Sequence, residues 1–187
     1  MTDKEISDIF IKTGAILEGH FLLSSGLHSD RYFQMAKVLQ FPELAKALAA
    51  EIAKKYVGLT INAVIGPALG GVVLSYVIAE QLGARSIFSE RENGIMTIRR
   101  GFTINQNENI LVCEDVITTG GSVSEVIDIV VSRGAHIIGV CCLVQRGPHH
   151  LKFPLHALVK MDTKHYNPAD CPLCREKLPL IKPGSRQ

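Results

Sequence analysis

Two adjacent acids followed by a turn rich in hydroxyls and glycines are the residues of this sequence best suited to chemistry. Glu114 and Asp115 come directly after the apolar run 110–113, and residues 118–122 read Thr-Thr-Gly-Gly-Ser. Like charges keep the acids from holding a phosphate, but carboxylates can accept hydrogen bonds from the vicinal hydroxyls of a ribose. Apolar residues then recur at helical spacing, so Ser122 is expected where a helix begins, with backbone N–H groups free for a phosphate. The pattern predicts a site for both ends of a ribose 5-phosphate.

A second glycine turn has the same setting. Residues 66–71 read Gly-Pro-Ala-Leu-Gly-Gly, follow the short apolar run 63–65 and precede another helical pattern. In open parallel sheets ligands bind beyond the carboxyl ends of the strands. We therefore expect both turns to border one crevice and to share one ligand.

The elements that position these turns alternate along the chain. Helical spacing predicts helices over residues 3–12 and 43–56, besides those that follow the two turns. Continuous apolar runs predict strands buried on both faces, at residues 63–65, 84–88, 110–113 and 137–144. This alternation predicts an α/β fold with a parallel sheet flanked by helices on both sides.

Two stretches do not fit the alternation. Residues 89–109 are polar and long for a connection, which indicates a lid or an excursion of short strands. After residues 146–148 the chain becomes less regular, and residues 182–187 are expected to be loose.

Composition limits the class of protein. The 187 residues, 47% of them hydrophobic, suit a single domain over 1–187 with a sizeable core. The net charge of +2 and the absence of a basic run exclude a nucleic-acid-binding face. The sequence has no signal peptide and no apolar stretch of membrane-spanning length. We therefore expect a cytoplasmic location and no membrane partner.

The five cysteines fall into two groups. Cys113, Cys141 and Cys142 lie in apolar runs, where thiols are usually small buried hydrophobes, so disulfides are not expected. Cys171 and Cys174 have the spacing of half a zinc knuckle, but a complete site needs four ligands. Only His165 lies near them in sequence as a third, so a metal site, a redox pair and a simple tight turn in the tail all remain open.

Residues 110–122 resemble the phosphoribosyl-pyrophosphate (PRPP) motif of the type I phosphoribosyltransferases, a hydrophobic strand followed by two acids and Val-Ile-Thr-Thr-Gly-Gly. The resemblance implies the fold of that family, a parallel sheet flanked by helices with a small hood subdomain. The hood would be formed mainly by about residues 1–35 and C-terminal residues. PRPP would be bound by Glu114, Asp115, Val116, Ile117, Thr118, Thr119, Gly120, Gly121 and Ser122. Pyrophosphate would be held by backbone amides of Ala68, Leu69, Gly70 and Gly71, because glycine permits an approach that a side chain would block.

The acceptor is indicated by two further segments. Residues 19–34 resemble the amino-terminal hood of orotate phosphoribosyltransferases, and Arg146 stands where that family ends its last sheet strand with an arginine. An arginine fork matches the planar carboxylate of orotate. The resemblance implies that Arg146 binds this carboxylate, that Tyr32 and Phe33 wall the ring, and that Thr118 bonds its rim. The alternative for Arg146 is an ordinary surface position at a strand end. The alternative for Tyr32 and Phe33 is plain packing in the core.

The resemblance also implies a catalytic loop, a metal and an assembly. A mobile loop over about residues 90–102 would bring Arg91, Arg99 and Arg100 to the leaving pyrophosphate. Mg²⁺ would bind through the substrate, reaching Glu114 and Asp115 at most through water or ribose hydroxyls. Because this loop serves a neighbouring subunit's site in the family, a homodimer with shared active sites is expected. Many members carry lysine and histidine in the loop and a lysine at position 24, all absent here, where position 24 is Ser24.

Two rival functions use the same donor motif. A purine phosphoribosyltransferase would need neither the arginine for a carboxylate nor this hood. A PRPP-sensing regulator that binds RNA or DNA without catalysis would need a basic face, which the near-neutral charge disfavours.

Overall fold

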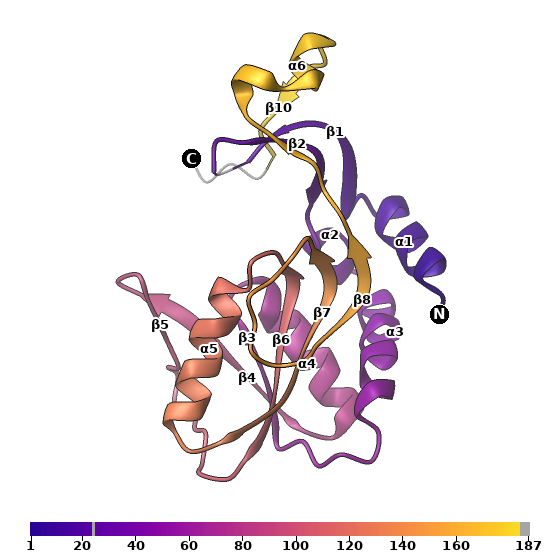
Figure 1. Cartoon of the computed structure of the whole chain (residues 1–187). Coiled ribbons are helices and arrows are strands. Elements are labelled where there is room, and N and C mark those ends of the chain that lie inside the picture. Colours follow the sequence, from indigo (N-terminus) through magenta and orange to yellow (C-terminus); the bar gives the residue numbers. More distant parts are fainter. Residues whose placement is uncertain (24, 184–187) are drawn as a thin grey trace.

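A computed structural model describes residues 1–23 and 25–183, and it contains two sheets (Figure 1). The larger has the order β5-β4-β3-β6-β7-β8, and all neighbours in it are parallel except β4 and β5. Its strands are β3 (Ala63–Pro67), β4 (Arg85–Glu92), β5 (Ile95–Thr97), β6 (Asn109–Ile117), β7 (His136–Arg146) and β8 (Leu155–Met161). We call this the central sheet. Position 24 and the tail 184–187 lie outside the described residues.

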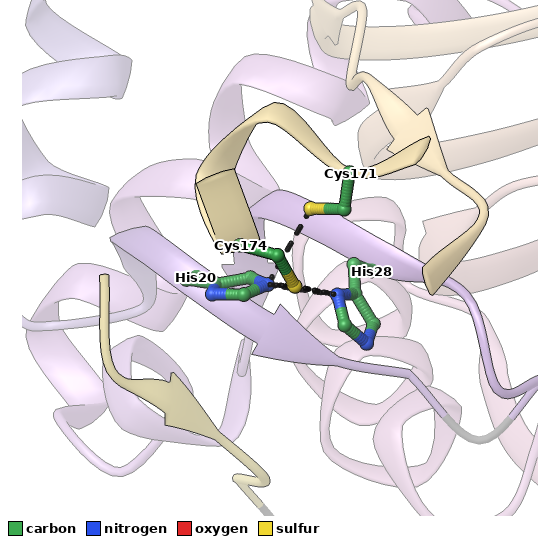
Figure 2. A group of neighbouring side chains, drawn as sticks. All are labelled: His20, His28, Cys171 and Cys174. Carbon is green, nitrogen blue, oxygen red and sulfur yellow. Dashed lines mark hydrogen bonds between the residues drawn. The ribbon is translucent and has the colours of Figure 1, made fainter. Parts of the chain in front are cut away.

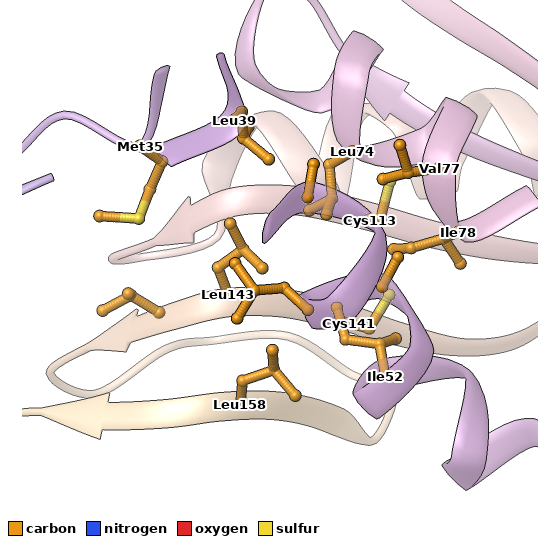
Figure 3. Close-up of a cluster of buried hydrophobic side chains, with 14 of the residues drawn as sticks. Met35, Leu39, Ile52, Leu74, Val77, Ile78, Cys113, Cys141, Leu143 and Leu158 are labelled. Atoms are coloured by element: carbon orange, nitrogen blue, oxygen red, sulfur yellow. The ribbon is translucent and has the colours of Figure 1, made fainter. Parts of the chain in front are cut away.

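Helices cover both faces of the central sheet, as the sequence predicted (Figure 1). Helices α3 (Pro42–Ala53) and α4 (Gly70–Leu82) pack on one face, and α5 (Gly121–Ser132) packs on the other. Alternate residues of β6 supply the two cores, since Leu111 packs with α4 and Val112 with α5. Figure 3 shows the first core, where Leu74, Cys113 and Leu143 meet.

The smaller sheet has the order β10-β1-β2-β9, and we call it the hood sheet. Strands β1 (Ile16–Leu22) and β2 (His28–Phe33) form an antiparallel hairpin, while β9 (His165–Tyr166) and β10 (Leu180–Ile181) add the C-terminal segment to its two edges. It lies beyond the carboxyl ends of β7 and β8 (Figure 1). The remaining elements are α1 (Asp3–Lys12), α2 (Ala36–Leu39), η1 (Lys54–Tyr56), η2 (Pro168–Asp170) and α6 (Pro172–Arg175).

The helices begin where their sequences provide a start. Thr2 and Glu5 form a capping box before α1, and Pro42 occupies the first position of α3. The helix expected over 43–56 changes to a 3₁₀ turn after Ala53. None of the helices in residues 1–23 and 25–183 has the length and apolar character that crossing a bilayer requires.

Several sequence expectations about strands need correction. Strand β6 continues to Ile117, so the acid pair lies within the strand rather than after it. The strand β8 was missed, because His156 and Lys160 interrupt its apolar pattern. Residues 89–109 include the end of β4 and all of β5, which pair antiparallel. Of the two expectations for this segment, a lid or an excursion of short strands, the structure shows the short strands.

Candidate active site

The end of β6 and the turn into α5 enclose a polar cavity of about 360 Å³. Its lining includes one acid of the predicted pair, most of the predicted PRPP-binding turn, and two charged residues from other elements. The lining residues are Arg91, Glu114, Val116, Ile117, Thr118, Thr119, Gly120, Gly121, Ser122 and Glu125. We call this the sugar-phosphate cavity.

The turn is shaped to present backbone N–H groups to this cavity. Gly120 has a φ of 85° and precedes the first helical residue, Gly121, so Ser122 is the second residue of α5 and lies where the helix begins, as predicted. N–H groups in the first helical turn have no carbonyl partner within their own helix. The turn is fixed from the outside, since the backbone N–H of His150 donates to the Thr119 carbonyl at 3.2 Å. A phosphate fits this combination of free donors and helix dipole.

The two acids point in different directions. Glu114 lines the sugar-phosphate cavity, while the Asp115 carboxyl lies against Gly70 of the second turn. Burial and the neighbouring Asp115 raise the pKa of Glu114 to about 8, and burial also raises the pKa of Asp115. Asp115 accepts a hydrogen bond from the backbone N–H of Val116 at 2.9 Å. At neutral pH Glu114 therefore holds a proton until donors or a cation arrive beside it.

The second turn is packed against the first through its glycines. A Cβ on Gly70 would overlap the Asp115 carboxyl, and one on Gly71 would come within 2.9 Å of the Gly66 backbone. These glycines are expected to admit a ligand, and the structure adds an internal packing reason for both. The peptide between Ala68 and Leu69 is cis, and the Ala68 N–H donates to the Ser89 carbonyl at 2.7 Å.

A second cavity, of about 520 Å³, opens beside this turn. Its lining is mostly apolar and includes Ala68, Leu69 and Gly70 of the turn together with Arg100. The Arg100 guanidinium lies 5.7 Å from the centroid of the Phe88 ring. The turn predicted to hold pyrophosphate thus has a cation next to it.

The three loop arginines are all paired with acids of the same chain. Arg91 binds Glu125 with N–O distances of 2.6 and 3.0 Å. Arg99 lies 3.2 Å from Glu92 and Arg100 lies 3.0 Å from Glu90, measured between side-chain nitrogen and oxygen. Arg91 lines the sugar-phosphate cavity, whereas Arg99 lines neither cavity. Exposed pairs of this kind contribute little stability, so an anionic ligand can replace the acid.

Arg146 is the least satisfied cation of the site. It ends β7, its side chain is half-buried, and its Nε has no hydrogen-bond partner among the described residues. Its guanidinium carbon lies 5.8 Å from the centroid of the Phe33 ring, and burial lowers its pKa. A buried donor without a partner is costly, so this Nε is a candidate hydrogen-bond donor to a ligand oxygen.

The two aromatic residues predicted to wall the orotate ring, Tyr32 and Phe33, contact different partners. Phe33 faces Arg146, while the Tyr32 ring packs on Phe21 at a centroid distance of 5.8 Å. Successive residues of a strand point to opposite faces, which explains the separation. Gln145 pairs with Ile117 across β7 and β6, so Arg146 follows at the level of Thr118, where the predicted PRPP-binding turn begins.

Sequence reasoning did not find the partners of the loop arginines. Glu125 and Phe88 lie in elements that looked like plain scaffold, and only the packing of β4 against α5 and the loop brings them to Arg91 and Arg100. The one available signal was the position of Glu125, the fifth residue of α5, close behind the glycine turn.

Comparison with known proteins decides the family. The family model for the phosphoribosyl transferase domain matches residues 34–173. An orotate phosphoribosyltransferase of Desulforamulus reducens is 51% identical over 100% of this chain and 99% of the relative. That of Thermotoga maritima is 49% identical over 97% of this chain and 98% of the relative. This chain belongs to the orotate phosphoribosyltransferase family.

Solved structures show the same fold, but they include both orotate and adenine phosphoribosyltransferases and so do not distinguish which base is the acceptor. The orotate phosphoribosyltransferase of Aeropyrum pernix superposes with a TM-score of 0.71 at 25% identity, covering 83% of this chain and 93% of that one. An adenine phosphoribosyltransferase of Trypanosoma brucei reaches 0.65 at 18% identity, covering 84% and 79%. The fold is therefore that of the type I phosphoribosyltransferases, and the assignment to the orotate phosphoribosyltransferase family depends on the full-length relatives.

Proposed function

We propose that this chain transfers the 5-phosphoribosyl group of PRPP to orotate, giving orotidine 5'-monophosphate and pyrophosphate for pyrimidine biosynthesis. The observation that carries the choice of base is Arg146, a half-buried guanidinium with an unpartnered Nε over the Phe33 ring. A flat ring that bears a carboxylate would stack on the Phe33 ring and, in the same pose, bind the Arg146 guanidinium through its carboxylate.

The donor would be held by both turns. The 5-phosphate binds the N–H groups at the start of α5, and Glu114 accepts hydrogen bonds from ribose hydroxyls. Pyrophosphate lies toward the Ala68–Leu69 turn, with Arg100 across the cavity. Because Asp115 joins the turns through Gly70, one substrate spans both without either having to move.

The chemistry requires no protein nucleophile. A ring nitrogen of orotate attacks C1 of the ribose, and the bond from C1 to pyrophosphate breaks with inversion at that carbon. Positive charge grows on the ribose and negative charge on the leaving group, so positioned cations and donors lower the barrier. Arg91 and Arg100 are the loop cations next to the two cavities, and each must exchange its acid for substrate.

Magnesium fits the donor set of the acid pair. Glu114 and Asp115 offer carboxylate oxygens, which Mg²⁺ prefers, and burial raises the pKa of both acids. When bound, Mg²⁺ would neutralise the charge of the substrate phosphates. A cation there would also favour the ionised form of Glu114, which is the form that accepts two ribose hydrogen bonds.

We further propose a homodimer through the outer face of α4. Leu69, Val73 and Tyr76 are 84%, 44% and 68% exposed along this face, and two of them border the second cavity. A second copy packed there would lie next to the pyrophosphate turn and could share its site. Tyr76→Arg is expected to give a monomer in light scattering, whereas Val131→Arg on α5 should leave the dimer intact. The cytoplasmic location inferred from the sequence stays a prediction.

The test of function is loss of orotate absorbance in the presence of PRPP and Mg²⁺. Turnover of adenine or hypoxanthine instead would support the purine-type rival. Retention of RNA or DNA without turnover of any base would support the regulator.

Arg91 offers a sharper test of the loop. Arg91→Ala should lower turnover by roughly 3 kcal/mol of transition-state stabilisation, the typical loss of one preorganised donor, and weaken PRPP binding less. Steady-state turnover and calorimetric PRPP affinity measure the two effects. Arg99→Ala is the matched control, since Arg99 lines neither cavity; equal losses of turnover and binding at Arg91 would contradict its role.

A further inference from the structure

Four metal-binding side chains meet in the hood, far from the cavities described above. Figure 2 shows His20 from β1 and His28 from β2 turned toward Cys171 and Cys174 of the C-terminal segment. One ligand atom of each lies within 4.8 Å of all the others. We call these residues the Cys₂His₂ cluster.

The distances within the cluster are those of a tetrahedral set. The Nε2 atom of His20 lies 3.5 Å from the Cys171 sulfur and 3.7 Å from the Cys174 sulfur. The His28 Nδ1 lies 3.4 Å from the Cys174 sulfur and 2.8 Å from the His20 Nε2. Bond lengths of about 2.3 Å to sulfur and about 2.0 Å to nitrogen give tetrahedral edges of about 3.3–3.8 Å. Of these four distances, only the one between the two histidines must widen, by about half an ångström on that estimate. The remaining two pairs of ligand atoms lie within 4.8 Å of each other.

The surroundings prepare one histidine as a ligand. The other ring nitrogen of His20, Nδ1, lies 2.9 Å from the Leu178 carbonyl, to which it can only donate. This fixes the tautomer, so that in the neutral ring Nε2 carries a lone pair aimed into the cluster. An outer hydrogen bond of this kind is typical of histidines that bind metals.

Burial argues against a chance meeting of surface residues. His20, His28 and Cys171 are 2%, 5% and 1% exposed, and only Cys174 reaches the surface. Two buried histidines and a buried thiol that meet a second, exposed thiol are hard to explain by packing alone. An exposed fourth ligand would give an ion a path into the cluster.

We propose that the Cys₂His₂ cluster binds one Zn²⁺ ion, which fastens the C-terminal segment to the hood hairpin. A set of two sulfur and two nitrogen ligands in tetrahedral arrangement favours zinc over magnesium or calcium. All four positions are taken by protein, so the ion is structural and leaves no place for a substrate. Metal binding would release the thiol protons as both cysteines become thiolates.

The fold explains how ligands from distant positions meet. The register of β1 against β2 shifts between Glu18 and Phe21, the stretch that contains His20. His28 pairs directly with Leu22, two residues along β1 from His20, so the two histidines lie diagonally across the hairpin. Strand β10 then pairs Leu180 with His20, which brings the tail alongside. The third ligand suggested by the sequence, His165, is not part of the cluster; its Nε2 lies 3.4 Å from the Thr163 hydroxyl.

Metal content of the full-length protein tests the proposal directly. Protein purified under reducing conditions without added metal should contain about one zinc per chain by elemental analysis, in line with the tight binding of structural sites. After removal of zinc by a chelator, Co²⁺ should produce the visible absorption of a tetrahedral ion and the near-ultraviolet band of cobalt–thiolate bonds. Added Zn²⁺ should displace both bands.

Substitutions assign the ligands. Cys174→Ser and His20→Asn should each weaken zinc binding by at least about 100-fold, since loss of an outer partner alone costs about 10–100-fold. His165→Asn is the matched control and should bind zinc as the original chain does. If a ligand variant does not fold, the cobalt spectrum of the unaltered protein still decides.

Three outcomes would overturn the proposal. They are a reduced protein that binds neither Zn²⁺ nor Co²⁺, a cobalt spectrum without thiolate bands, or a His165→Asn variant that loses zinc as His20→Asn does. The first result, together with a Cys171–Cys174 disulfide in protein purified without reductant, would indicate a redox pair instead. Orotate turnover is measured separately, so failure of the zinc site leaves the proposed function intact.

Discussion

The two sheets of this protein are held together by different means. In the central sheet, residues 110–113 of β6 are completely buried, and apolar cores lie on both faces. In the hood sheet two of four strands have only two residues, and its most buried side chains include the polar His20, His28 and Ser29. Hydrophobic burial is sufficient for the first sheet, whereas the second depends on specific polar links.

This difference matters because the proposed base-binding site lies where the sheets meet. Arg146 ends a strand of the central sheet, and the ring facing it, Phe33, ends a strand of the hood. The donor turns belong wholly to the central sheet. On the proposed function, donor binding would require only the central sheet and its turns, while choice of the base would also require the hood to be in place.

The largest expected effect compares the same substitution in both sheets. Leu111→Ala in the central sheet should lower the free energy of unfolding by about 4 kcal/mol, because Leu111 is fully buried. Leu180→Ala in β10 should cost less than about 1 kcal/mol, since Leu180 is 46% exposed. Urea unfolding measures both. Equal losses would mean that the hood is part of the same cooperative core.

At the junction, Arg146→Met separates binding from stability. It should lower kcat/KM for orotate by about 100-fold, near 3 kcal/mol, through loss of a charged hydrogen-bond donor. The unfolding free energy should stay equal or rise, because a partly buried donor without a partner is replaced by an apolar chain. PRPP affinity serves as the control. A parallel fall in PRPP affinity and stability would make Arg146 a structural residue.

The central sheet could be predicted because its signals are local. The runs at 63–65 and 110–113 are apolar and short. The first is followed at once by a glycine turn and the second within seven residues, and helical spacing comes after each turn. Fold class, the position of both turns and the donor motif follow from such neighbours in sequence. Strand β8 did not follow, because at the sheet edge polar residues are tolerated and the pattern fades.

The hood could not be predicted in the same way. Its strands β1 and β2 carry His20, Arg31 and other polar residues without clear alternation, and its outer strands come from the other end of the chain. The Cys₂His₂ cluster joins residues about 150 positions apart, as the contact between Cys171 and His20 shows. Spacing rules for zinc sites detect only the Cys171–Cys174 half, and so pointed to His165.

Removal of the proposed zinc should affect the hood and spare the central sheet. Chelation is expected to make opening of the C-terminal segment easier by about 2 kcal/mol, which speeds proteolysis there by about 30-fold. Mass spectrometry of the first fragments should locate cuts at basic residues such as Lys164 and Arg175. The urea midpoint of the central sheet should change little. First cuts in the central sheet instead would show that the metal supports the whole domain.

The smallest effect concerns pH and the acid of the sugar-phosphate cavity. The pKa of Glu114 is raised to about 8 from an ordinary 4.5, so the folded protein keeps a proton that the unfolded chain releases. Stability should therefore fall as pH rises from about 4.5 to about 8 and should not fall further on this account above that range. Glu114→Gln cannot lose a proton, so its advantage over the original chain should grow across the same window.

Because solvent reaches the Glu114 carboxyl, we expect that advantage to be only about 1 kcal/mol at pH 9. Urea unfolding at pH 6 and pH 9 measures it, and Glu125→Gln is the control, since Glu125 lines the same cavity but is paired with Arg91. Identical pH profiles for Glu114→Gln and the original chain would show that the carboxyl is already ionised in the empty site. In that case the proposed ribose site would not lower the stability of the central sheet through a buried charge. The central sheet and the hood sheet would then differ only in how they are packed.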